Sequence, residues 1–138
     1  MSPRNLYRTA AVLLVVFAIL HTIGFAQVDP AWGIDKLISE VRASTFTALG
    51  QQRTFWDFYL GLGYSVTVWL LVAALTAWEL GRTTAPLPLI RWGLVGAMLA
   101  TAALSWRYIF PPPLVNSLLI AVILAWAAVR ASGRPDRP

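Results

Sequence analysis

The chain has 138 residues, of which 58% are hydrophobic and 12% are charged, well below the usual charged share of ~25%. A soluble domain could not hide this much apolar surface, so the composition favours a membrane protein. The net charge of +5 comes without basic clusters interleaved with aromatic residues, which argues against a nucleic-acid partner, and the lack of Cys excludes disulfides, thiolate metal sites and cysteine catalysis.

Four apolar runs are long enough to cross the ~30 Å hydrocarbon core of a bilayer as helices. Three consecutive prolines separate the third run from the fourth, and the Gly- and Pro-containing tail at residues 132–138 is expected to be disordered. We therefore expect an all-α, integral membrane four-helix bundle that forms a single domain. The predicted spans are approximately residues 9–27, 55–78, 87–110 and 113–130.

The first apolar run has a second interpretation. Arg4 and Arg8 form a basic segment before it, and Gly24-Phe25-Ala26 is compatible with a cleavage site. A secretory signal peptide that is later removed is therefore an alternative to a first membrane span.

The loop between the first two spans contains a further helical pattern. Apolar residues recur at helical spacing over residues 34–49 with charged residues between them, and Gly50 is a natural stop. This pattern predicts a short amphipathic helix in the outer loop. Its expected role is to cap the bundle and anchor it at the headgroups, and the alternative is a lid over a site below.

The distribution of basic residues predicts the orientation. With the N-terminus inside, seven basic residues lie on the cytoplasmic side and four on the outer side, so both termini are expected in the cytoplasm. The cytoplasmic set is Arg4, Arg8, Arg82, Arg91, Arg130, Arg134 and Arg137. The outer set is Lys36, Arg42, Arg53 and Arg107.

Polar residues from all four spans are predicted to gather near the outer boundary, while the inner half of the spans is almost entirely apolar. At ~1.5 Å per residue, these polar residues lie within about two helical turns of that boundary. An ionisable group inside a span is costly and indicates a function. The candidate ligand-binding residues are His21, Arg53, Asp57, Tyr64, Arg107 and Asn116.

Helical spacing also predicts how these residues face one another. Arg53, Asp57 and Tyr64 share one stripe of the second span. Arg107 shares a stripe with small residues of the third span, and such stripes let membrane helices approach closely. We therefore expect this stripe to face a neighbouring helix, with Asp57 as the counter-charge of Arg107. The small residues are Gly93, Gly96, Ala100 and Ala103.

Each of the three ionisable candidates also has a structural interpretation. Thr54 and Asp57 resemble a capping box at a helix N-terminus. Arg107 can extend to the interface or form a structural ion pair. His21 can form a hydrogen bond between helices without taking part in chemistry.

Three segments resemble a family of small bacterial four-span membrane proteins of unknown function. They are HTIGF at residues 21–25, FWDFYLGLGY at 55–64 and SWRYIFPPP at 105–113. The resemblance covers nearly the whole chain in matching order and implies a location in the bacterial inner membrane, but it brings no assigned activity. The layout is also loosely similar to DoxX-like proteins and to the sterol isomerase and sigma-2 receptor group.

Two functions follow from these expectations. The first is a binding protein, or an enzyme, for a lipophilic molecule such as a quinone, an isoprenoid or a lipid. The second is a structural or accessory subunit of a larger membrane complex, or a homo-oligomer, in which the polar layer only fixes helix register. One His and one acid in the layer are too few for an ordinary metal site, and no cofactor motif is present. The sequence leaves open whether there is catalysis.

Overall fold

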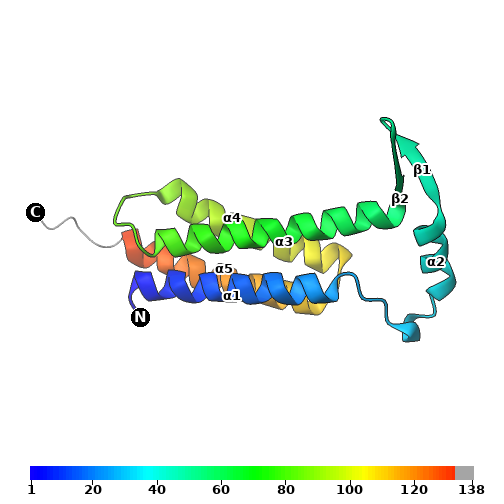
Figure 1. The fold of residues 1–138 in the computed structure, drawn as a ribbon. Helices are drawn as coiled ribbons and strands as arrows, with labels where there is room; N and C mark the ends of the chain where they lie inside the picture. The colour runs from blue at the N-terminus through cyan, green and yellow to red at the C-terminus, as the bar shows by residue number, and fades with distance from the viewer. Residues whose placement is uncertain (133–138) are drawn as a thin grey trace, which may run out of the picture. The chain divides into compact units, whose positions relative to one another are not determined.

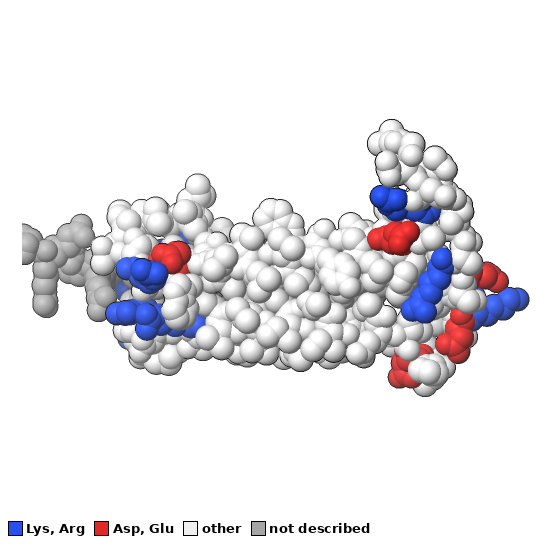
Figure 2. All heavy atoms as spheres, in the orientation of Figure 1, with Lys and Arg blue, Asp and Glu red and all other residues white. Residues whose placement is uncertain are grey.

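The computed structural model describes residues 1–132, and four of the helices in that range are long and apolar enough to span a membrane. They are α1 (Pro3–Gly24), α3 (Phe55–Leu80), α4 (Pro88–Tyr108) and α5 (Pro111–Ser132), shown in Figure 1. Each predicted span falls on one of them. Along the visible lengths of α1 and α3, charged atoms gather at the helix ends (Figure 2). From residue 133 onward, the predicted tail lies outside the described residues.

Proline residues mark the beginnings of three of these helices. Pro3, Pro88 and Pro111 each stand in the first turn, where the missing N–H has no partner to lose. Ser2 assists α1, because its Oγ accepts a hydrogen bond from the Asn5 amide at 3.3 Å. These local signals explain why the helices begin where they do.

The chain divides into two compact units, and the division falls inside α1 and α3. The first, here called the α4–α5 unit, comprises residues 1–17 and residues from 70 onward. Within it, α4 and α5 pack side by side and are joined at residues 109–110 (Figure 1). The buried residues of α5 are mostly small or aliphatic, which permits close helix packing. They are Ser117, Ile120, Ala121, Leu124, Ala127 and Ala128.

The second unit, here called the loop unit, comprises residues 18–69. Between α1 and α3 it contains a short 3-10 helix, η1 (Pro30–Trp32), the helix α2 (Asp35–Ala43), and an antiparallel hairpin of β1 (Thr45–Ala48) and β2 (Gln51–Thr54). A helix thus covers residues 35–43 of the predicted 34–49, and its place in an outer loop stays a prediction. The prediction of helix is wrong beyond residue 43, where the chain forms a small sheet that the all-α prediction did not include.

The turn of the hairpin explains this error. Leu49 and Gly50 both have positive φ angles, 50° and 78°, which is the combination that a two-residue type I′ turn requires. Thr45, Phe46 and Thr47 are β-branched or aromatic and favour a strand. Gly50 thus ends no helix, but turns one strand into the next.

Candidate functional site

His21 lies in the last turn of α1 and is held from two sides within the loop unit. Its Nε2 lies 3.0 Å from the Gly63 carbonyl oxygen of α3, and its ring stacks on Phe25 with centroids 5.1 Å apart and planes 14° apart. Because a carbonyl oxygen only accepts, Nε2 must bear the proton. In the neutral ring Nδ1 is then an acceptor, and it forms no hydrogen bond with any other described residue.

The approach of α3 to this cluster depends on a glycine. A Cβ added at Gly63 would lie 2.1 Å from the Phe25 ring, closer than any real contact. At Gly61, two residues earlier in the same helix, nothing lies within 4 Å of an added Cβ. Gly63 is therefore required by the Phe25 ring, whereas Gly61 is not.

Aromatic rings extend the cluster beyond His21. Phe25 contacts Tyr64 edge-on with centroids 5.1 Å apart, and contacts Tyr59 at 5.9 Å. The Tyr59 hydroxyl donates to the Phe25 carbonyl oxygen. Tyr59 in turn stacks on Trp56 at 5.2 Å. We call His21, Phe25, Tyr59 and Tyr64 the His21 cluster. Two of the predicted site residues, His21 and Tyr64, are thus brought together through Phe25.

Asp57 and Arg53 make local contacts instead. Asp57 Oδ2 accepts hydrogen bonds from the Thr54 amide at 2.7 Å and the Thr54 hydroxyl at 2.9 Å, and the Asp57 amide donates to Thr54 Oγ1 at 3.0 Å. This reciprocal arrangement is a capping box with Asp in place of Glu. Arg53 donates to the Gln52 carbonyl oxygen at 2.7 Å. The structural interpretation of Asp57 is therefore confirmed, and it explains why α3 begins at Phe55.

The other two predicted residues belong to the α4–α5 unit. Arg107 is exposed and its Cζ lies 5.1 Å from the ring centroid of Tyr108, its neighbour in sequence. Asn116 is half-buried in α5. The pairing of Arg107 with Asp57 stays a prediction. The small-residue stripe was predicted to face a neighbouring helix, but it is exposed, because larger α4 residues such as Leu94 and Met98 form the buried face.

Buried polar side chains also occur in the α4–α5 unit, at positions outside the predicted site. Arg91 and Tyr7 are only 7% and 1% exposed in the α4–α5 unit, and Ser117 is fully buried. The Tyr7 hydroxyl and the Arg91 Nε form no hydrogen bond with any described residue. The place of Arg91 near the start of the third apolar run was predicted, but its burial in the first turn of α4 was not.

No group of three His, Cys, Asp or Glu side chains within residues 1–132 lies close enough together to hold a metal ion. In comparisons with known proteins, no family model, no curated protein and no solved structure matches this chain. The resemblance to small four-span bacterial proteins therefore stays an inference from the three sequence segments.

Proposed function

We propose that the chain is a four-span protein of the bacterial inner membrane, with its helices forming a bundle and both termini in the cytoplasm. The four apolar helices support insertion. Arginines stacked on tryptophans near helix ends support the depth assignment, since such pairs suit the interface. Arg8 pairs with Trp78 near the C-terminal end of α3, Arg130 with Trp126 near that of α5, and Arg42 with Trp56 near the N-terminal end of α3. In this orientation α2 lies on the outer surface, with its apolar residues toward the headgroups.

Within the membrane, the proposed function is to bind a lipophilic molecule with a polar head at the His21 cluster. The observation that supports this most is the free Nδ1 of an imidazole whose Nε2 is already held by the Gly63 carbonyl oxygen. An ionisable group in a span with an unused polar atom indicates a ligand. The rings of Phe25, Tyr59 and Tyr64 supply an apolar surface beside it.

The chemistry favours a ligand whose head donates a hydrogen bond. A hydroxyl of a quinol, an isoprenoid alcohol or a lipid can donate to Nδ1 while its tail lies among apolar side chains. Asp57 has no part in this proposal, since its carboxylate serves the helix cap.

The test is native mass spectrometry of the protein extracted gently from its own membrane. We expect a discrete small-molecule mass on the wild type that is lost in His21→Ala. Thr22→Ala is the matched control, because it removes a cross-helix hydrogen bond of 2.9 Å to Thr67 in the same unit but leaves the imidazole. Loss of the mass in both variants, or no bound mass on the wild type, would contradict the proposal.

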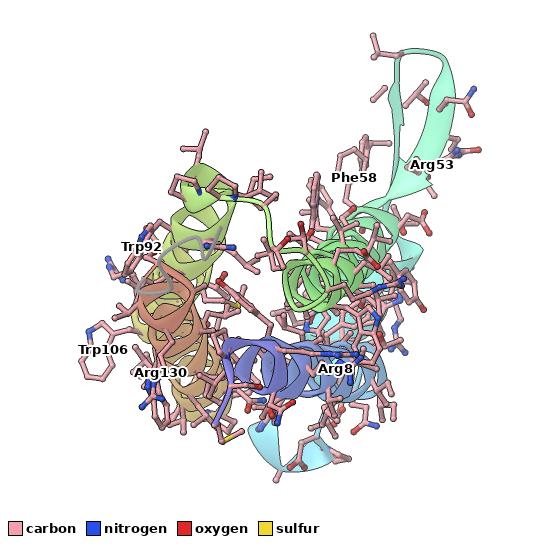
Figure 3. The ribbon with its side chains drawn as sticks, turned by 90° about the vertical axis from the view of Figure 1, so that its left-hand side faces the viewer. Arg8, Arg53, Phe58, Trp92, Trp106 and Arg130 are labelled. Carbon is pink, nitrogen blue, oxygen red and sulfur yellow. The ribbon has the colours of Figure 1, made fainter. Side chains whose placement is uncertain are left out.

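A second candidate function is that of a subunit in a homo-oligomer or a larger membrane complex. Trp69 is 70% exposed and lies about 21 Å from the first residue of α3 and about 17 Å from the last, near the middle of the span. Tryptophan usually stands at the interface, so an exposed one at mid-depth favours a neighbouring helix. Trp106 also points away from α4 (Figure 3).

The exposed glycines of α4 allow a sharp test of this second candidate. Nothing lies within 4 Å of a Cβ added at Gly93 or Gly96, so a Cys fits at either position. The chain has no Cys of its own, and each variant therefore has a single reactive thiol. Disulfide-linked dimers of Gly96→Cys in native membranes, absent from a Gly61→Cys control, would support a homo-oligomer through this face of α4.

A further inference from the structure

Arginines in the α4–α5 unit far outnumber acids. Its described residues, 1–17 and 70–132, contain six Arg and a single acid, Glu79. Glu79 pairs with Arg82 at 3.4 Å, and both side chains are largely exposed. The other arginines therefore form no ion pair with a carboxylate of the described part of this unit. They are Arg4, Arg8, Arg91, Arg107 and Arg130.

Most of these arginines lie at the end of the unit where α1 begins and α3 ends. A Cβ added at Gly81 would lie 3.2 Å from the Arg4 carbonyl oxygen and 3.3 Å from the Tyr7 Cβ, so the first turns of α1 contact the end of α3 directly. Arg91 is in the first turn of α4, and Arg130 in the last turn of α5, at the same end (Figure 1). Positive charge is thus concentrated there.

Part of this charge is buried without compensation. Arg91 Nη2 donates to the Ala85 carbonyl oxygen at 2.9 Å, while its Nε has no acceptor among the described residues. A buried cation without an anion is strongly unfavourable. An external anion would therefore stabilise this end of the unit.

Arg8 stands where such an anion can reach the unit. Its Cζ lies 5.0 Å from the ring centroid of Trp78, and its buried Nε has no acceptor among the described residues. Arg8, Thr9, Val12 and Leu13, all on α1, line a shallow and open groove of about 290 Å³ along that helix. The groove is thus lined by hydrocarbon and lies beside the Arg8 side chain.

We propose that this end of the α4–α5 unit binds an anionic phospholipid. The lipid phosphate lies on the Arg8 guanidinium, whose fork of donors matches phosphate oxygens. The first carbons of an acyl chain lie in the groove against Val12 and Leu13. Arg4 and Arg91 add positive potential, as in other basic pockets between membrane helices that hold acidic headgroups. The site rests on the proposed membrane insertion, but it uses no residue of the His21 cluster, so failure of the His21 proposal would leave it standing.

The experiment uses delipidated full-length protein in a zwitterionic detergent, supplied with either phosphatidylglycerol or phosphatidylcholine. Native mass spectrometry counts retained lipid, and thermal unfolding measures the accompanying rise in Tm. We expect the wild type to retain phosphatidylglycerol in preference to phosphatidylcholine. Arg8→Gln should weaken this retention about tenfold or more, the usual effect of losing a charge-assisted hydrogen bond. Arg82→Gln removes the same charge from an exposed site and should retain the lipid.

A second variant tests the groove without changing any charge. Val12→Trp fills the groove and should lower retention of phosphatidylglycerol while leaving the arginines in place, so the inference stays testable even if Arg8→Gln fails to fold. Equal losses of phosphatidylglycerol in Arg8→Gln and Arg82→Gln would mean that the lipid is held only by the overall positive charge, and this would overturn the inference. So would a full rise in Tm with inorganic phosphate alone, or equal retention of both lipids by the wild type.

Discussion

Gly63 leaves no room for a methyl group beside Phe25, and this makes the packing of the His21 cluster measurable. A Cβ at Gly63 would lie 2.1 Å from the Phe25 ring, so Gly63→Ala must displace that ring. Overpacking of this kind costs about 1–3 kcal/mol. Replacing Gly by Ala inside a helix also stabilises the folded state by about 0.5–1 kcal/mol, because Ala lowers the conformational entropy of the unfolded chain.

Gly61 provides the matched control. It lies in the same helix, but nothing lies within 4 Å of an added Cβ, so Gly61→Ala should only gain the entropic term. The two alanine variants should therefore differ in free energy of unfolding by about 1–3 kcal/mol, with Gly63→Ala the less stable. The assay is unfolding in mixed micelles by added denaturing detergent, followed by the helical circular dichroism signal.

A double-mutant cycle assigns the difference to the Phe25 ring. Once the ring is removed there is no overlap, so Phe25→Ala should cost less in the Gly63→Ala background than in the wild type. Equal stabilities of Gly61→Ala and Gly63→Ala would refute the close approach of α3 to Phe25. Strictly additive effects of Phe25→Ala and Gly63→Ala would refute it as well.

Three further predictions concern the loop unit. Thr54→Ala removes the hydroxyl of the capping box and should lower the free energy of unfolding by about 1 kcal/mol, with fraying of the first turn of α3 visible in amide hydrogen exchange. Leu49→Asn places a residue that tolerates positive φ before Gly50 and should stabilise the hairpin by about 1 kcal/mol; unchanged hydrogen exchange in β1 and β2 would contradict the type I′ turn. Asp57→Asn should still carry the small molecule that the wild type binds, as seen by native mass spectrometry. Loss of this molecule in the variant would show that Asp57 belongs to the ligand site.

The four long apolar helices could be predicted from sequence because hydrophobic length depends only on composition along the chain. The depth predicted for His21, near the outer boundary, stays a prediction, although its contact with α3 through Gly63 is now described. Reasoning from the sequence did not find the hairpin. Apolar residues at helical spacing over residues 34–49 outweighed the turn signal at Gly50, and a Leu with positive φ before it has no sequence signature.

Partners of side chains were harder to predict than their depth. The capping box at Thr54 and Asp57 was visible as a motif, but the motif does not say whether the carboxylate is also free to bind a ligand. The rotation of α4 was predicted from its small residues, yet its larger side chains form the buried face and bury Arg91 with them. The rotation of α4 depends on how its side chains fill the space against the neighbouring helix. The spacing of residues along α4 alone does not give the shape of that space.

Nitrogen NMR of the imidazole tests the central claim most directly, because His21 is the single His of the chain and its signals need no assignment. The sample is the protein as extracted with its native lipophilic molecules, measured before and after these are stripped. We predict that Nε2 remains protonated in both states, through its bond to the Gly63 carbonyl oxygen, and that the Nδ1 signal shifts on stripping. A proton on Nδ1 with Nε2 bare, or an Nδ1 signal that does not move, would contradict a ligand at the His21 cluster.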